Sequence, residues 1–109
     1  MSAGDIEPPF QVSMNERTKQ RQQALVRRSL LVGLWDRFAR AMSDIEHALQ
    51  HEPRSWGDPV QNLLGMSAIK YRRLYDNLVV IYAVHRDLPA VWLTSVEPTQ
   101  YSPLWIGEG

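Results

Sequence analysis

The stretch that decides the fold runs from Arg54 to Pro98 and reads RSWGDPVQNLLGMSAIKYRRLYDNLVVIYAVHRDLPAVWLTSVEP. It contains three short runs rich in β-branched and aromatic residues, a composition typical of strands. The predicted strands are Ser67 to Leu74, Leu78 to Val84 and Ala90 to Val96. Turn-forming residues separate them at Asp76-Asn77 and at Arg86 to Pro89, so we expect an antiparallel meander.

The chain before this stretch is predicted to be mainly helical. Phe10 to Met14 alternates apolar and polar residues, which predicts a short strand. Asn15 is a suitable N-cap for a helix over Glu16 to Leu31. A second helix from about Leu34 to His51 ends at Glu52-Pro53, because the residue before a proline is pushed out of the helical region. The expected fold is therefore α+β, with a short N-terminal strand and two helices packed on an antiparallel β-meander.

The second predicted helix has one apolar face, because its apolar residues recur at three- and four-residue steps. Trp35, Phe38 and Met42 lie on that face and are expected to cover the sheet. Trp56 is expected at the junction between helix and sheet. We interpret Val60 to Gly65 as a link that leads into the sheet.

Length and composition indicate one domain. The chain has 109 residues, enough to bury a core without crosslinks, and no cysteine, which excludes disulfides. We expect a flexible arm over residues 1–9, the folded domain over 10–98 and a tail over 99–109. No apolar run approaches the roughly 20 residues of a membrane span, and the N-terminus does not resemble a secretion signal. We therefore expect a cytoplasmic protein with no membrane partner.

The charges balance at 12 basic and 12 acidic residues, so the net charge is near zero. Proteins whose affinity comes mainly from phosphate contacts are usually basic. This balance disfavours a general nucleic-acid coat protein, although a local basic patch is still compatible with it.

Three motifs in the second half resemble the RelE/ParE-type toxins of type II toxin–antitoxin systems, a superfamily that includes plasmid stabilisation proteins. They are Pro53 to Val60, similar to the family pattern P-R-x-x-G-x-P, Ile69 to Arg73, similar to Y-R-x-R, and Leu78 to Val84, similar to V-V-Y-x-V. The order strand, helix, helix and meander is also the plan of that family. The resemblance covers roughly Phe10 to Pro98.

The resemblance implies a metal-free, ribosome-associated mRNA endoribonuclease that a cognate antitoxin neutralises. In that chemistry the ribose 2′-hydroxyl attacks the adjacent phosphate, and cations stabilise the charge of the transition state. The residues that match the catalytic set are Lys70, Arg72 and Arg73, with Tyr101 or Trp105 as a late aromatic residue. The two-residue period of a strand puts Lys70 and Arg72 on one face and Arg73 on the other.

The sequence departs from the active nucleases at two places. Val79 lies where the central strand often carries an arginine, and Glu97 to Thr99 follow the last strand where a basic residue is common. These departures favour an alternative, a non-catalytic or gyrase-targeting protein of the same fold. An unrelated α+β interaction protein is a third reading. Neither a metal nor a small-molecule cofactor is expected.

Two further groups of residues have both a functional and a structural reading. Arg17, Arg21 and Arg28 form a rough stripe on the first helix, which is either a partner-binding or nucleic-acid-steering stripe or an exposed polar face. His47 and His51 lie four residues apart, a spacing that can hold a metal, but the intervening glutamate of a zinc-protease motif is missing. The basic residues of the first meander strand could likewise be a solvated face.

Overall fold

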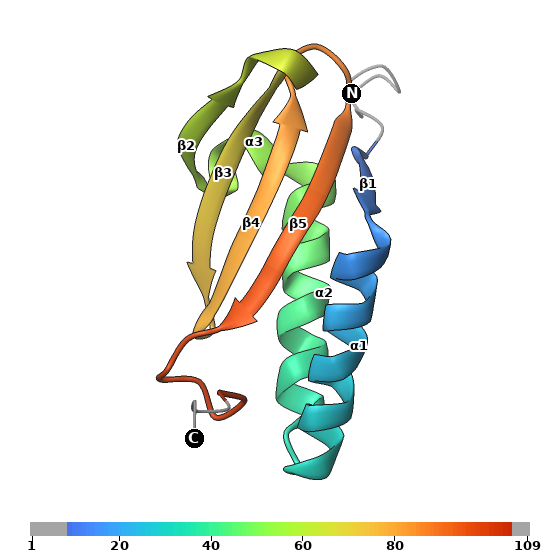
Figure 1. Cartoon of the computed structure of the whole chain (residues 1–109), viewed down its shortest axis with the longest axis vertical. Coiled ribbons are helices and arrows are strands. Elements are labelled where there is room, and N and C mark those ends of the chain that lie inside the picture. The colour runs from blue at the N-terminus through green and yellow to red at the C-terminus, as the bar shows by residue number, and fades with distance from the viewer. Residues whose placement is uncertain (1–8, 106–109) are drawn as a thin grey trace, which may run out of the picture.

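The computed structural model describes residues 9–105 and is an α+β fold with three helices and a five-stranded mixed sheet (Figure 1). The helices are α1 (Glu16–Leu31), α2 (Trp35–His51) and the single-turn α3 (Pro53–Trp56). The strands are β1 (Gln11–Met14), β2 (Asp58–Leu63), β3 (Ala68–Tyr75), β4 (Leu78–His85) and β5 (Ala90–Pro98), with a 3-10 turn η2 (Leu64–Met66) before β3. The predicted arm lies outside the described residues except for Pro9.

The strand order across the sheet is β1-β5-β4-β3-β2. Strands β3, β4 and β5 pair antiparallel with their neighbours, which confirms the predicted meander. The first strand pairs parallel with β5, from Gln11 opposite Ala90 to Met14 opposite Leu93. The two long helices lie against one face of the sheet, so the other face, called the open face below, has no helix over it among the described residues (Figure 1).

The core forms where α2 crosses the sheet. Its buried residues follow the predicted three- and four-residue steps, at Phe38, Ala41, Ile45, Ala48 and Leu49. They pack in one cluster with buried side chains of the sheet, which include Leu78, Val80, Tyr82, Val84, Val91 and Leu93. Helix α1 is mostly polar and buries only Thr18, Leu25 and Ser29.

Trp35 departs from the predicted core. Its side chain is 41% exposed, whereas Phe38, one turn later, is 2% exposed. The reason is its position at the start of α2, where the helical hairpin extends beyond the end of the sheet (Figure 1). The periodicity identified the correct face of the helix, but it contains no information on how far the sheet reaches.

The predicted link over Val60 to Gly65 is wrong in one respect, because most of it belongs to strand β2. This strand pairs antiparallel with β3 and has an irregularity between Pro59 and Gln61. Five of its six residues are exposed, and Pro59 has no N–H to donate, as is typical of an edge strand. The meander therefore has a fourth antiparallel strand at its edge.

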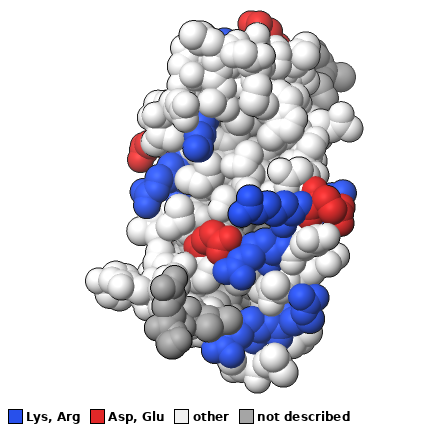
Figure 2. All heavy atoms as spheres, in the orientation of Figure 1, with Lys and Arg blue, Asp and Glu red and all other residues white. Residues whose placement is uncertain are grey.

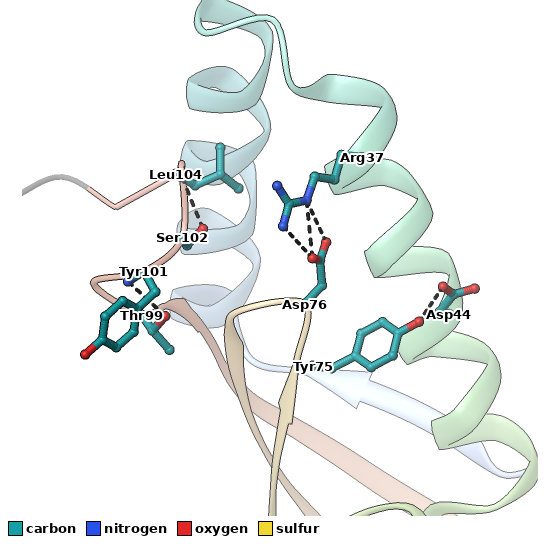
Figure 3. A network of polar contacts seen from close by, with 8 residues as sticks. All are labelled: Arg37, Asp44, Tyr75, Asp76, Thr99, Tyr101, Ser102 and Leu104. Atoms are coloured by element: carbon teal, nitrogen blue, oxygen red, sulfur yellow. Dashed lines mark hydrogen bonds and ion pairs between the residues drawn. The ribbon is translucent and has the colours of Figure 1, made fainter.

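The turn between β3 and β4 confirms the role predicted for Asp76-Asn77. Both residues have positive φ, 49° and 59°, which a two-residue type I′ hairpin requires. Arg37 of α2 binds Asp76 through two nitrogens, with a shortest distance of 2.7 Å, and so ties the helix to this turn (Figure 3). The Tyr75 hydroxyl donates to Asp44 at 2.7 Å, and this hydrogen bond raises the pKa of Tyr75.

The segment after β5 is packed against the domain. The N–H of Thr99 donates to the carbonyl oxygen of Asn77, and Leu104 is only 6% exposed beside Phe38 and Leu78. Tyr101 is 77% exposed and points away from the Arg37 ion pair in Figure 3. Within the described part of the predicted tail, residues 99–105, Leu104 belongs to the core.

Candidate nucleic-acid interface

The open face carries alternate residues of β3, β4 and β5. The register pairs Lys70 with Ala83, and Ala83 in turn with Trp92. Side chains directly opposite each other on neighbouring strands point to the same face. Lys70 and Trp92 therefore share a row of the open face, separated by one small alanine. The register therefore puts Trp92 on the open face.

A second row of the open face contains Arg72, Ile81 and Ser95. Arg72 is exposed, and Lys70 is partly buried. Asp58 lies opposite Arg72 on β2, but neither cation makes an ion pair with any described residue. Figure 2 shows basic side chains over β3, with an acidic side chain beside them at the edge of the sheet, and a second group of charged side chains over α1 and β5. The charge of both cations is therefore open to a ligand.

His85 adds a second ring beside Trp92. Their ring centroids are 6.3 Å apart and their planes are inclined by 51°. The Nδ1 atom of His85 accepts hydrogen bonds from the backbone N–H groups of Asp87 and Leu88, both at 3.0 Å. In the neutral ring the proton therefore lies on Nε2, which is left as a donor. The sequence did not single out this pair, although strand alternation through a known register would have found it.

Arg73 is separated from the other two predicted cations, as the strand period predicts. Its Nη1 donates to the carbonyl oxygen of Trp56 at 2.9 Å, and its guanidinium lies 5.3 Å from the centroid of that indole. Trp56 also contacts Tyr75 and Tyr82, with ring centroids about 6 Å away. It therefore lies at the helix–sheet junction, as expected, and Arg73 braces that junction on the face opposite Lys70 and Arg72.

Tyr101 lies beyond the end of the sheet that holds the β3–β4 turn. Its N–H donates to the Thr99 hydroxyl, and Thr99 is bound to that turn. Arg72 and Lys70 lie three and five residues before the end of β3, or about 10 and 17 Å along the strand. The described contacts therefore do not bring Tyr101 into one cluster with Lys70 and Arg72. Trp105, the other late aromatic residue, is 44% exposed in the same segment.

The three arginines of the predicted stripe on α1 have different surroundings. Arg21 binds Glu97 of β5 through Nε and Nη2, at distances of 2.7 to 3.0 Å, and this hydrogen bonding raises the pKa of Arg21. Arg17 is exposed and has no ion pair among the described residues. Arg28 is half-buried, and its Nε has no hydrogen-bond partner in the described part of the chain. Only Arg17 and Arg21 therefore face a common space.

The histidines of α2 form a pair and not a site with further ligands. The rings of His47 and His51 lie with their centroids 4.4 Å apart. Residues 9–105 contain no group of three histidine or carboxylate side chains placed to hold a metal. In the same range, no helix is long and apolar enough to cross a membrane.

The open face therefore combines an indole and an imidazole with two cations that have no ion pair within residues 9–105. Cations bind phosphate groups, and aromatic rings stack on unpaired bases, so this combination fits single-stranded nucleic acid. Comparison of the chain with protein-family models, with curated proteins and with solved structures finds no match. The geometry of the face is thus the basis for a functional hypothesis.

Proposed function

We propose that this protein is a toxin of the RelE/ParE superfamily and that it binds single-stranded RNA on its open face. The order strand, helix, helix and meander supports the family, and edge strand β2 is an addition to the plan expected from the sequence. The observation that carries the RNA-binding proposal is the shared face of Lys70, Arg72 and Trp92, with both cations free of ion pairs among the described residues.

In this proposal the cations have an electrostatic role in RNA cleavage. Lys70 and Arg72 bind the phosphate that the 2′-hydroxyl attacks and stabilise the extra negative charge of the transition state. The P–O5′ bond breaks as the P–O2′ bond forms, the proton of the 2′-hydroxyl passes through solvent to the leaving 5′-oxygen, and the products are a 2′,3′-cyclic phosphate and a 5′-hydroxyl end. Trp92 stacks on a neighbouring base and fixes the strand. His85 Nε2 donates a hydrogen bond to the ligand. Arg73 acts through Trp56 as a structural residue, and Tyr101, whose described contacts lie at the β3–β4 turn, has no direct role in this cluster.

The partners in this proposal are those of a type II toxin. Messenger RNA on the ribosome is the target, and a cognate antitoxin neutralises the protein in the cytoplasm by covering sheet and helix surfaces. Covering of this kind is a common mode of peptide recognition, because an extended segment or an amphipathic helix lies along a groove.

A second candidate function is binding to a protein target, such as gyrase, without RNA cleavage. The observation that favours it is the row formed by Leu74, Val79 and Glu97 on the open face. Leu74 is 55% exposed, and Val79 occupies the position where the nucleases often have an arginine. The exposed leucine and the valine beside it fit a protein surface better than a phosphate backbone, and Glu97 in the same row would repel phosphate.

Induced expression in a bacterial host tests the toxin proposal. We expect growth arrest, and we expect co-expression of the neighbouring gene to relieve it if that gene encodes the antitoxin. The K70A/R72A double variant should lose toxicity under the nuclease reading. The matched control is R27A/R40A, which removes two exposed cations from the helices. Immunoblotting must show equal amounts of each protein.

The outcomes separate the two functions. Loss of toxicity in K70A/R72A with full toxicity in R27A/R40A supports RNA cleavage. Mapping of mRNA ends should then find new 5′ termini with the wild type and with R27A/R40A but not with K70A/R72A. Full toxicity in both variants supports a protein target. A wild-type protein that neither arrests growth nor copurifies with a partner contradicts the toxin proposal.

A further inference from the structure

A polar groove runs between the first turns of α1 and the second half of β5. Its volume is about 680 Å³, and its lining includes Asn15, Arg17, Gln20, Arg21, Ser95 and Glu97. Charged side chains gather where α1 lies beside β5 in Figure 2. This space is called the α1–β5 groove below. The RNA-binding hypothesis based on the sheet did not use it.

The groove adjoins the open face through Ser95. This residue lines the groove and also ends the row that contains Arg72 and Ile81. Two strand spacings of about 4.8 Å place the Cα atoms of Arg72 and Ser95 about 10 Å apart. A polymer that leaves the open face at Arg72 can therefore continue directly into the groove.

Two arginines give the groove its charge. Arg17 is exposed and makes no ion pair with a described residue. Arg21 is held by Glu97, but the side chains of that pair are 45% and 43% exposed. An exposed ion pair contributes little to stability, so a competing anion can replace the carboxylate at small cost. A phosphate offers the same bidentate geometry to a guanidinium.

The lining of the groove fits a sugar–phosphate backbone and not a base. Besides Arg17, Arg21, Glu97 and one apolar residue, Val96, its lining consists of amides and hydroxyls, which are common partners of phosphate and sugar oxygens. They belong to Asn15, Thr18, Gln20, Thr94 and Ser95. The groove has no aromatic side chain among its lining residues, whereas the open face has Trp92. One strand of RNA can therefore contact two surfaces, with its bases stacked on the open face and its backbone in the groove.

We propose that the α1–β5 groove binds the backbone phosphates of the same single-stranded RNA whose bases lie on the open face. Glu97 occupies Arg21 in the free protein and is displaced by phosphate. The groove thus extends the length of RNA that the protein contacts, and Glu97 lowers the affinity because it competes with phosphate for Arg21. This inference rests on the proposed RNA-binding function.

Fluorescence anisotropy with labelled oligouridine of 4 and 12 nucleotides tests the groove. R17A should weaken binding of the longer RNA roughly three- to tenfold and leave the shorter one nearly unchanged. For R17A, a plot of the logarithm of the binding constant against the logarithm of the salt concentration should be shallower by about 0.7. This is the value for one lost phosphate contact on a single strand. Glu97→Gln should strengthen binding of the longer RNA by a similar factor, and this gain should vanish in the R21A/E97Q double variant.

Glu46→Gln is the matched control, because it removes one exposed negative charge from α2, away from the groove. If it strengthens binding as much as Glu97→Gln does, net charge explains the effect and the groove proposal is overturned. If K70A/R72A abolishes binding while the groove variants behave as wild type, the groove proposal fails and the RNA-binding function stands. A wild type that binds neither RNA contradicts the RNA-binding function and, with it, the groove proposal. Melting curves should confirm that every variant is folded.

Discussion

The buried hydroxyl of Tyr82 accepts the backbone N–H of Gly57 at 2.8 Å, and the same hydroxyl donates to the carbonyl oxygen of Pro53 at 2.7 Å. Tyr82 is fully buried in the central strand β4, so one side chain fixes both ends of the segment that joins α2 to the sheet. The motif Pro53 to Pro59 and the central strand are therefore physically linked.

Replacing Gly57 by alanine should destabilise the protein. A Cβ at this position would lie 2.7 Å from the Tyr82 hydroxyl oxygen and 3.1 Å from the Arg72 carbonyl oxygen. Because the Tyr82 ring is fully buried, it cannot move aside, and we expect a cost of about 1–3 kcal/mol in the free energy of unfolding. Urea denaturation measures it. The control is Gly65→Ala, whose new Cβ would meet nothing within 4 Å; an equal loss there would contradict the steric explanation.

Tyr82→Phe should destabilise the protein and also change its response to alkaline pH. The variant leaves the Gly57 N–H and the Pro53 carbonyl without their partner, at a cost of about 1–3 kcal/mol. Burial raises the pKa of Tyr82 to about 12 from 10.0. The native state therefore holds this proton at pH values where the unfolded chain releases it.

The sign of the pH effect follows from that difference. Below pH 10 Tyr82 is protonated in both the folded and the unfolded state, and its full contribution to the free energy of unfolding is present. That contribution is lost as the pH rises towards 12. Over that range the free energy of unfolding of the wild type should fall by on the order of 2 kcal/mol because of this group. The free energy of unfolding of Tyr82→Phe should depend less on pH. Denaturation at pH 8 to 11.5 tests this. Tyr101→Phe, at an exposed position, should keep the wild-type profile.

Leu104→Ala should destabilise the domain, although the residue lies in the tail. Its side chain is 6% exposed and belongs to the core cluster that contains Phe38 and Leu78. Removing a buried leucine typically costs about 2–5 kcal/mol, and we expect the lower end here because the segment lies at the edge of the core. Tyr101→Ala, in the same turn but 77% exposed, should change stability by less than about 0.5 kcal/mol. Thermal melting compares the two, and equal effects would mean that the tail is not anchored by Leu104.

The sequence was sufficient to predict the elements whose signals are local. The meander, the apolar face of α2 and the turn at Asp76-Asn77 depend on composition and spacing within a few residues, and each is present in the structure. The shared face of Lys70 and Arg72 follows in the same way from strand alternation. These predictions required no knowledge of which segments meet.

The features that sequence could not predict depend on contacts between distant residues. Strand β2 has no apolar alternation and exists because β3 offers it a free edge. The contact of Trp92 with His85 depends on the register of β4 against β5, in which Ala83 lies opposite Trp92. The constraint on Gly57 comes from the Tyr82 hydroxyl, which lies 25 residues further along the chain in β4. Each of these features is set by tertiary packing.

Trp92→Ala should weaken binding of single-stranded RNA more than binding of a simple polyanion. Stacking of a base on an aromatic ring is worth about 1–3 kcal/mol, so we expect roughly a tenfold loss of affinity for a 12-nucleotide RNA. Trp92→Phe should restore most of the affinity because it keeps a ring on the open face. Heparin, which has charges but no bases, should bind both variants and the wild type alike.

The control for this prediction is Trp105→Ala, which removes a tryptophan that is 44% exposed in the C-terminal segment. It should leave RNA affinity unchanged, because the open-face row is formed by Lys70, Ala83 and Trp92. If Trp92→Ala weakens heparin and RNA binding equally, the ring supports the shape of the sheet and does not stack on bases. If Trp105→Ala has the larger effect on RNA, the bases lie at the end of the sheet, near Tyr101, and not over its centre.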